Sequence, residues 1–233
     1  RALKIIKDKG LQKQFYTQHE IPTSDYQLFA SEEELREAIA TAKLSFPFVQ
    51  KSRTAGYDGK GVALLKNEAD LPKLLPGPSL VEELVDIEKE LSVIAARNEN
   101  GEIATFPLVE MEFNEEANLV EFLLCPARVE DAVAQEADQL ARKVIQAFDI
   151  CGLLAVELFW TKTGEILVNE VAPRTHNSGH HTIESCLTSQ FQQQLRAVLN
   201  LPLGSTQATS PAVMLNLLGE PGHTGPAQYQ GFE

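Results

Sequence analysis

The sequence is short of positive charge. It has 20 lysine and arginine residues against 33 aspartate and glutamate residues, which gives a formal net charge of −13 at pH 7. Nucleic-acid backbones and anionic lipid surfaces are both held by basic protein surfaces, so we expect neither nucleic acid nor membrane as a partner. A small phosphorylated ligand remains compatible, because a few local cations and backbone N–H groups suffice to hold it.

Cysteine is also scarce. Cys125, Cys151 and Cys186 are odd in number and widely spaced, which fits neither a disulfide framework nor a zinc-binding pattern. We therefore expect a cytoplasmic protein. The most apolar stretch, residues 150–160, is interrupted by Glu157 and is too short to span a bilayer. The sequence does not begin with Met, and we expect it to be a fragment or a processed product.

The remaining composition is that of a globular α+β chain. With 233 residues, 43% of them hydrophobic, the chain can bury the core of one large or two small domains. Apolar periodicity, turn residues and a capping box of Ser31 with Glu34 predict where the elements lie. We expect helices over residues 2–18, 31–42, 129–149 and 183–199, and strands over 26–29, 47–51, 62–65, 80–85, 90–97, 103–107, 153–161 and 165–171.

A glycine-rich segment, residues 51–61, joins two of these strands. Its glycines allow backbone N–H groups to approach an anion, and Lys51, Arg53 and Lys60 supply positive charge. The segment matches neither the Walker pattern nor the dinucleotide-binding fingerprint. It is therefore interpreted either as a lid over phosphates or as a solvated hairpin turn.

Two glutamates are predicted to face each other on the last two strands. If Thr163-Gly164 is a two-residue turn, Glu157 pairs directly with Glu170. Like charges placed opposite each other are destabilising among apolar neighbours, and a bound Mg²⁺ would compensate them. The alternative is that both glutamates lie on a hydrated face or that the turn is one residue longer.

Residues 173–181 gather a guanidinium, imidazoles, an amide and a hydroxyl in one loop after the second of these strands. Such polar density after a strand end is typical of a functional site. His176 and His180 could also ligate a metal. This reading is disfavoured, because Pro173 and Gly179 argue against a regular helix and no glutamate lies between the histidines.

Together, five segments resemble the 5-(carboxyamino)imidazole ribonucleotide synthases, which are ATP-grasp enzymes. The resemblance extends from about residue 2 to residue 218, and the Pro-Arg-x-His-Asn-Ser-Gly-His stretch is its most specific part. It is carried by residues 56–61, 81–83, 169–174, 176–180 and 188–191. It implies an α+β ATP-grasp fold in which two lobes clamp ATP, with the family's N-terminal Rossmann-like domain lying outside this chain.

The resemblance also implies a division of the chain and an assembly. Residues 1–18 would be a linking helix, 19–78 the small lobe with the lid, 79–203 the large lobe with the metal and substrate site, and 204–233 the start of a C-terminal domain. The family suggests a homodimer.

The implied activity is the carboxylation of 5-aminoimidazole ribonucleotide with ATP and bicarbonate through carboxyphosphate, in purine biosynthesis. The resemblance assigns ATP binding to Lys9, Lys51, Gly56, Tyr57, Asp58, Gly59, Lys60, Gly61, Glu82, Glu83, Leu84, Val85, Glu90, Asn169 and Glu170. It assigns Mg²⁺ to Glu157 and Glu170, and substrate binding to Tyr57, Asp58, Arg174, His176, Asn177 and Ser178. The catalytic residues would be Arg174, His176 and Asp58.

Three other hypotheses stay open. The chain could be another ATP-grasp ligase, similar to biotin carboxylase or to glycinamide ribonucleotide ligase, although the histidine-rich loop speaks against both. It could be an ATP-binding core that is inactive through truncation. It could also be a histidine-ligated metal hydrolase.

Overall fold

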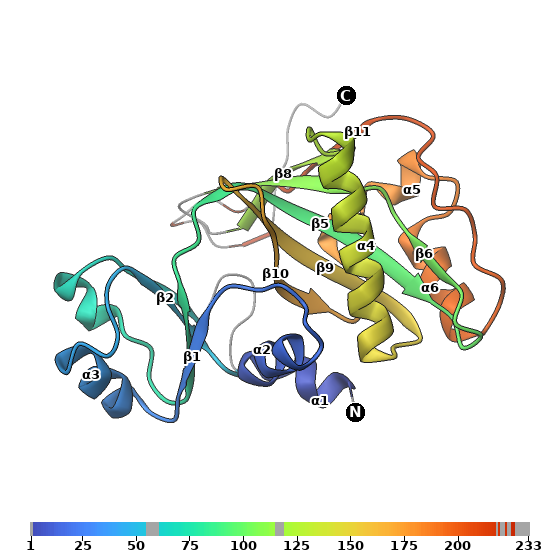
Figure 1. Cartoon of the computed structure of the whole chain (residues 1–233). Helices are drawn as coiled ribbons and strands as arrows, with labels where there is room; N and C mark the ends of the chain where they lie inside the picture. Colours follow the sequence, from blue (N-terminus) through green and yellow to red (C-terminus); the bar gives the residue numbers. More distant parts are fainter. Residues whose placement is uncertain are drawn as a thin grey trace.

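The computed structural model describes residues 2–54, 61–114 and 119–217, together with 219, 222, 225 and 226. These residues form a four-stranded and a seven-stranded antiparallel sheet, which lie side by side in Figure 1. The four-stranded sheet has the order β1-β4-β2-β3. The seven-stranded sheet has the order β10-β9-β5-β7-β8-β11, with β6 beside β5. No helix within the described ranges is long and apolar enough to cross a membrane.

The small sheet is built from β1 (Tyr26–Phe29), β2 (Phe48–Ser52), β3 (Val62–Leu65) and β4 (Ser79–Glu83). Helix α3 (Glu32–Ala40) covers it, and Ser31 caps this helix by accepting a hydrogen bond from the Glu34 backbone, as the sequence predicts. A 3-10 helix, Glu68–Lys73, follows β3. Phe29, Leu35, Phe48 and Leu65 form the core between sheet and helix.

The expected boundary between the small and the large lobe, between residues 78 and 79, does not match the sheet topology. Strand β4 was assigned to the large lobe, but it pairs with both β1 and β2 at the centre of the small sheet. The two sheets therefore separate after Glu83. At the other end, β11 (Ala212–Leu215) pairs with β8, so part of the segment 204–233 extends the large sheet.

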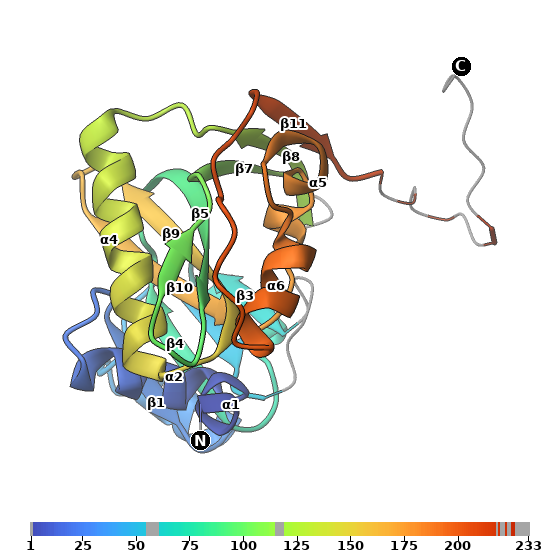
Figure 2. The same ribbon diagram turned by 90° about the vertical axis from the view of Figure 1, so that its right-hand side faces the viewer.

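The large sheet has helices on both faces, as Figure 2 shows. It comprises β5 (Ile87–Arg97), β6 (Ile103–Thr105), β7 (Val109–Asn114), β8 (Leu119–Cys125), β9 (Gly152–Thr161), β10 (Ile166–Ala172) and β11. Helix α4 (Asp131–Phe148), predicted from its apolar stripe, packs one face through Leu140, Val144 and Phe148. The opposite face has its own apolar cluster around Ile94 and Leu153.

Two expected helices are interrupted. The predicted helix 2–18 is divided into α1 (Ala2–Ile6) and α2 (Lys9–Gln18), because Asp8 leaves the helical conformation and caps α2. Its carboxylate accepts hydrogen bonds from the backbone of Gly10 and Leu11 and pairs with Arg53. The predicted helix 183–199 is likewise divided, into α5 (Thr182–Ser185) and α6 (Gln190–Val198), because Ser189 forms a capping box at the start of α6.

Candidate active site

Glu157 on β9 lies directly opposite Glu170 on β10, as the sequence predicts, although the turn is the longer of the two alternatives. The loop is one residue longer: the Thr161 N–H donates to the Glu165 carbonyl, and Gly164 adopts a φ of +90°. Near the turn the pairing is therefore offset by one residue from the prediction.

A β-bulge at Asn169 restores the expected register. The ladder shifts between Val168 and Glu170, so that Asn169 is the extra residue on β10. Val168 and Val171 point into the core beneath α4, which leaves the Glu170 side chain on the opposite face. The bulge brings the Asn169 amide beside the same carboxylate, where it accepts a hydrogen bond from Lys51.

A third carboxylate lies on this face. Ser92 of β5 is opposite Glu157, and Glu90 is two residues earlier on the same strand, with Leu91 between them turned toward α4. Burial and the nearby charge of Glu157 raise the pKa of Glu90 to about 7. Over the ranges that the structure describes, no three His, Cys, Asp or Glu side chains converge closely enough to hold a metal ion by themselves.

Lysines from the first part of the chain face these carboxylates. Lys9, at the start of α2, forms an ion pair with Glu170. Lys51 on β2 places its Nζ 2.8 Å from Asn169 Oδ1 and 2.5 Å from Glu82 Oε2. Burial, with the neighbouring Lys51, lowers the pKa of Lys9 to about 8. The cations therefore bridge the small sheet and α2 to the edge of the large sheet.

Lys13 is a member of this cluster that the sequence interpretation missed. It lies one helical turn after Lys9 on α2, and its Nζ is 2.5 Å from Glu82 Oε1. It also donates hydrogen bonds to Thr23 and Ser24. The four-residue spacing from Lys9 is the signal in the sequence that could have identified it.

The polar loop after β10 folds back onto the same face. His176 accepts a hydrogen bond from the Ser178 backbone through Nδ1, and its Nε2 lies 3.3 Å from Glu157 Oε1. Ser178 Oγ is 2.9 Å from Ser92 Oγ. Gln190 holds the His176 backbone from both sides, by accepting from its N–H and donating to its carbonyl. Neither Ser92 nor Gln190 was among the predicted site residues.

Two other predicted residues of this loop have different surroundings. Arg174 donates a hydrogen bond to the neighbouring Thr175 carbonyl, and its guanidinium forms no ion pair with the residues that the structure describes. The Asn177 side chain exchanges two hydrogen bonds with the amide of Asn216, at 2.9 and 3.1 Å. Asn177 thus connects the loop to the segment that follows β11.

The residues expected at the nucleotide base lie at the end of β4. Glu82 is buried, and its backbone lies between β1 and β2 in the small sheet. Glu83 and Leu84 are exposed, and Leu84 and Val85 lie in the connection to β5, outside both sheets.

The glycine-rich lid is described only in part. Gly61 accepts a hydrogen bond from the Ser52 N–H and has a φ of +78°, a conformation that glycine adopts readily. The predictions for Gly56, Tyr57, Asp58, Gly59 and Lys60 lie outside the described residues.

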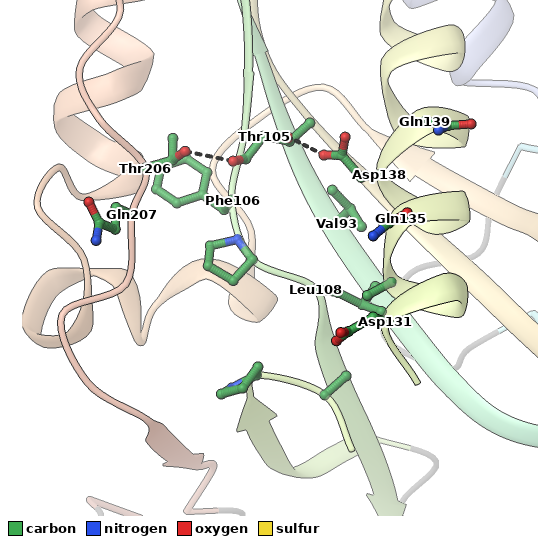
Figure 3. Close-up of a pocket in the computed structure, with 14 residues that line it drawn as sticks. Val93, Thr105, Phe106, Leu108, Asp131, Gln135, Asp138, Gln139, Thr206 and Gln207 are labelled. Carbon is green, nitrogen blue, oxygen red and sulfur yellow. Dashed lines mark hydrogen bonds between the residues drawn. The ribbon is translucent and has the colours of Figure 1, made fainter. Parts of the chain in front are cut away.

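The described surface also has cavities away from this cluster. One of them, of about 530 Å³, lies between α4 and the segment 105–108 and is lined by Val93, Phe106, Asp131 and Gln135 (Figure 3). Val93 belongs to the core beneath α4, so this cavity is on the face of the large sheet opposite the carboxylates. The cavity at the lysines and glutamates is small, because the ion pairs close it. Another cavity, of about 590 Å³, is lined by His180, His181, Phe191 and Met214, so cavity size alone does not single out the α4 face.

Comparison with known proteins gives consistent matches. The family model of the ATP-grasp domain matches residues 14–191. The chain is 41% identical over 222 residues to the N5-carboxyaminoimidazole ribonucleotide synthase of Bacillus subtilis, which covers 94% of this chain and 57% of that protein.

Two solved structures extend the match to the fold. The synthetase of the same name from Thermotoga maritima superposes with a TM-score of 0.83 and 47% identity, covering 95% of this chain and 56% of that one. An Aspergillus clavatus synthase in complex with ADP and 5-aminoimidazole ribonucleotide superposes with a TM-score of 0.85 and 32% identity, covering 94% and 59%. The chain thus spans a little more than half the length of these relatives.

Proposed function

The chain belongs to the ATP-grasp family, and we propose that it is the core of a ligase that carboxylates 5-aminoimidazole ribonucleotide with ATP and bicarbonate, in purine biosynthesis. The observation that carries the proposal is the meeting of Lys9 and Lys51 with the opposed Glu157 and Glu170, beside the histidine-containing loop. The similarity to named synthases supports this reaction over those of other ATP-grasp ligases.

The proposed reaction has two steps. A bicarbonate oxygen bonds to the γ-phosphorus of ATP while the bond to the bridging oxygen breaks, which gives carboxyphosphate and ADP. The exocyclic amine of 5-aminoimidazole ribonucleotide then bonds to the carboxyl carbon. Phosphate leaves with its oxygen, and the amine nitrogen loses a proton. The product is 5-(carboxyamino)imidazole ribonucleotide.

In this proposal the lysines hold the ATP phosphates, and residues 56–61 close over them. Lys9 and Lys51 supply positive charge at the place where the transferring phosphoryl group would develop negative charge. The backbone of residues 82–85 would contact the adenine, with Glu83 at the rim. Glu90 would accept hydrogen bonds from the ribose hydroxyls, a role that is supported by its place on the carboxylate face.

The opposed glutamates fit a divalent cation. Both carboxylates lie on one face of the sheet, and in the chain alone the Lys9 ammonium balances one of them. Carboxylate and amide oxygens are suitable ligands for Mg²⁺, so Glu157 and Glu170, with Asn169 beside them, would hold it. Mg²⁺ bound there would neutralise charge on the phosphates during phosphoryl transfer.

The loop residues are proposed to act on the carboxyl group and the amine. The Arg174 guanidinium could grip a carboxyphosphate-like anion with two parallel hydrogen bonds. His176 Nε2 points at Glu157, and Nδ1 lies 2.9 Å from Ser178 Oγ, to which a protonated Nδ1 can donate. We propose that, in this tautomer, the unprotonated Nε2 atom takes up the proton that the amine loses. The substrate nucleotide would be bordered by Asn177, Ser178, Tyr57 and Asp58. Asp58 would also assist catalysis.

Assembly, location and domain boundaries are also proposals. A cytoplasmic homodimer is proposed from the family resemblance. The free thiols of Cys125, Cys151 and Cys186 are consistent with a reducing compartment. For the division of the chain, we propose a small lobe that ends after Glu83 and a large lobe from β5 onward.

The test is ADP release from ATP and Mg²⁺ in bicarbonate buffer, with and without 5-aminoimidazole ribonucleotide. The proposal expects the nucleotide to stimulate ADP release, and bicarbonate-free buffer to remove this stimulation. Arg174→Ala should lose the stimulation while ATP binding is kept, and Arg36→Ala on the exposed face of α3 serves as the control. ADP release that does not depend on the aminoimidazole nucleotide would indicate another ATP-grasp ligase.

A second candidate function is an ATP-binding core without turnover. The chain spans 56% to 59% of the two structures compared above, so binding and turnover are tested separately. Isothermal titration with ATP and Mg²⁺ separates the two candidates. Binding without any ADP release would favour the binding core, and absence of binding would remove both.

A further inference from the structure

Lys13 has an ammonium group with no donor left for a ligand. The side chain is 2% exposed, and its three N–H groups have acceptors in Glu82 Oε1, Thr23 Oγ1 and Ser24 Oγ, at 2.5, 2.5 and 2.9 Å. Thr23 in turn donates to the Val168 carbonyl, next to the bulge in β10. Lys13 therefore cannot contact a phosphate directly, although it lies one turn from Lys9.

Glu82 is the group through which Lys13 can act. Its Oε1 atom faces Lys13 and accepts a hydrogen bond from Ser24, and its Oε2 atom is 2.5 Å from Lys51. Burial raises the pKa of Glu82, but Lys51 and Lys13 outweigh it and lower this pKa to about 2. The carboxylate thus stays charged between two buried cations.

Lys51 differs from Lys13 in its donors. Among the residues that the structure describes, its ammonium group has two partners, Glu82 and Asn169, which leaves a third N–H for a ligand. Glu82 holds the Lys51 ammonium in place, but its negative charge also cancels the positive charge of that ammonium. A lysine–glutamate pair alone has no net charge and would attract an anion weakly.

We propose that Lys13 is a positioning residue for nucleotide binding: it offsets the buried charge of Glu82, so that Lys51 is held in place and still presents a positive charge to the phosphates. The three side chains carry a net charge of +1, and Lys51 is the member whose third donor has no partner in the part of the chain that the structure describes. The inference rests on the proposed function, because it assumes that Lys51 meets the ATP phosphates.

The test measures ATP and ADP affinity by isothermal titration for the whole chain and its variants. Lys13→Met removes the offsetting charge, and ADP should bind about 10- to 100-fold more weakly, as expected for a unit charge roughly 6 to 12 Å away at an effective dielectric constant near 20. Lys73→Met removes a charge from the exposed 3-10 helix and should bind ADP as the unaltered chain does. Thermal denaturation reports whether each variant is folded.

The double variant Lys13→Met/Glu82→Gln distinguishes an electrostatic role of Lys13 in nucleotide binding from a role in stabilising the fold. It restores the net charge of one, so ADP affinity should recover at least several-fold relative to Lys13→Met. If Lys13 only supports the fold, the double variant should bind no better than the single one, and this outcome would overturn the inference. Lys13→Gln, which can still hydrogen-bond to Ser24 and Glu82, is the second neutral variant. Failure of both neutral variants to fold would assign Lys13 to stability and also overturn the inference.

The outcomes separate this inference from the proposed function. If the unaltered chain binds ATP and Lys13→Met binds it equally well, the positioning role of Lys13 is refuted, whereas the ligase proposal is unaffected. If the unaltered chain binds no ATP, both fail.

Discussion

The ammonium of Lys9 and the carboxylate of Glu170 form an ion pair that joins the start of α2 to β10, across 161 positions of the sequence. The pair occupies one of the two carboxylates proposed for Mg²⁺. Under the proposed function, Mg²⁺ at Glu170 and a phosphate at Lys9 would compete with this contact, because each would bind one of its two partners.

Glu170→Gln should remove Mg²⁺-dependent turnover. The amide keeps the size of the side chain but cannot supply an anionic ligand, and we expect ADP release to fall by about 100-fold or more, as is typical when a charge-stabilising group is lost. The measurement is ADP release over a Mg²⁺ titration. Glu165→Gln, an exposed position at the end of the same hairpin, is the matched control and should retain activity. Equal activity in the two variants would contradict a metal role for Glu170.

Glu90→Gln should stabilise the protein at alkaline pH. Burial and Glu157 raise the pKa of Glu90 from its ordinary 4.5 to about 7, so the folded state favours the protonated form. Its unfavourable contribution is absent below pH 4.5, grows as the pH rises through 7, and is complete above it. We expect the variant to gain about 1–3 kcal/mol in free energy of unfolding at pH 8.

Urea denaturation of both proteins at pH 5 and pH 8 measures this difference. The gain should be much smaller at pH 5, where the carboxyl group is largely protonated in the folded state. A gain of the same size at both pH values would show that the substitution acts through packing rather than through the ionisation of Glu90.

Asn169→Ala should weaken nucleotide binding without unfolding the chain. The Asn169 amide oxygen accepts a hydrogen bond from Lys51, and its loss leaves that ammonium held by Glu82 alone. We expect ATP affinity to fall about 3- to 10-fold, the net worth of one ordinary hydrogen bond, because the amide acts on the nucleotide only through Lys51. Isothermal titration measures the change. Asn67→Ala, which removes the cap of the exposed 3-10 helix, provides the comparison and should leave ATP affinity unaltered.

Gly179→Ala should displace the histidine loop. A Cβ atom at this position would lie 2.3 Å from Ile94 Cδ1 and 2.7 Å from Gln190 Oε1, so neighbouring atoms must move. Gln190 holds the His176 backbone, and its displacement should lower kcat more than it raises the KM for ATP. The loss of stability should be about 1–3 kcal/mol, as for other overpacked cores.

Steady-state kinetics and urea denaturation together measure these effects. Gly77→Ala in the connection before β4, where a Cβ would meet open space, is a control for kinetics. Gly77 also has a positive φ, so an alanine there is strained. Any stability that Gly77→Ala loses therefore measures backbone strain without contact with the site. Unaltered kcat in Gly179→Ala would contradict a positioning role for Gln190.

Part of the fold could be predicted from local pattern. The apolar stripe of α4 and the cap at Ser31 depend on residues within a few positions of each other, and both are present. Strands β7 and β8 were missed, although the alternation of acidic and apolar residues over 109–113 is typical of a strand with one buried face. The breaks at Asp8 and Ser189 were missed because the apolar spacing continues across them.

The sequence by itself determined which chemistry the chain can offer: paired carboxylates on a predicted hairpin, lysines and a glycine-rich segment before them, and a polar loop after them. Tertiary structure alone decided how these groups meet. The bulge at Asn169 offsets the longer turn so that Glu157 still faces Glu170, and the packing of α2 against the 23–24 segment decides that Lys13 is buried beside Glu82. The physical reason is that hydrogen bonds and ion pairs between distant residues depend on how the sheets and helices pack, whereas caps and periodic stripes depend only on near neighbours in the chain.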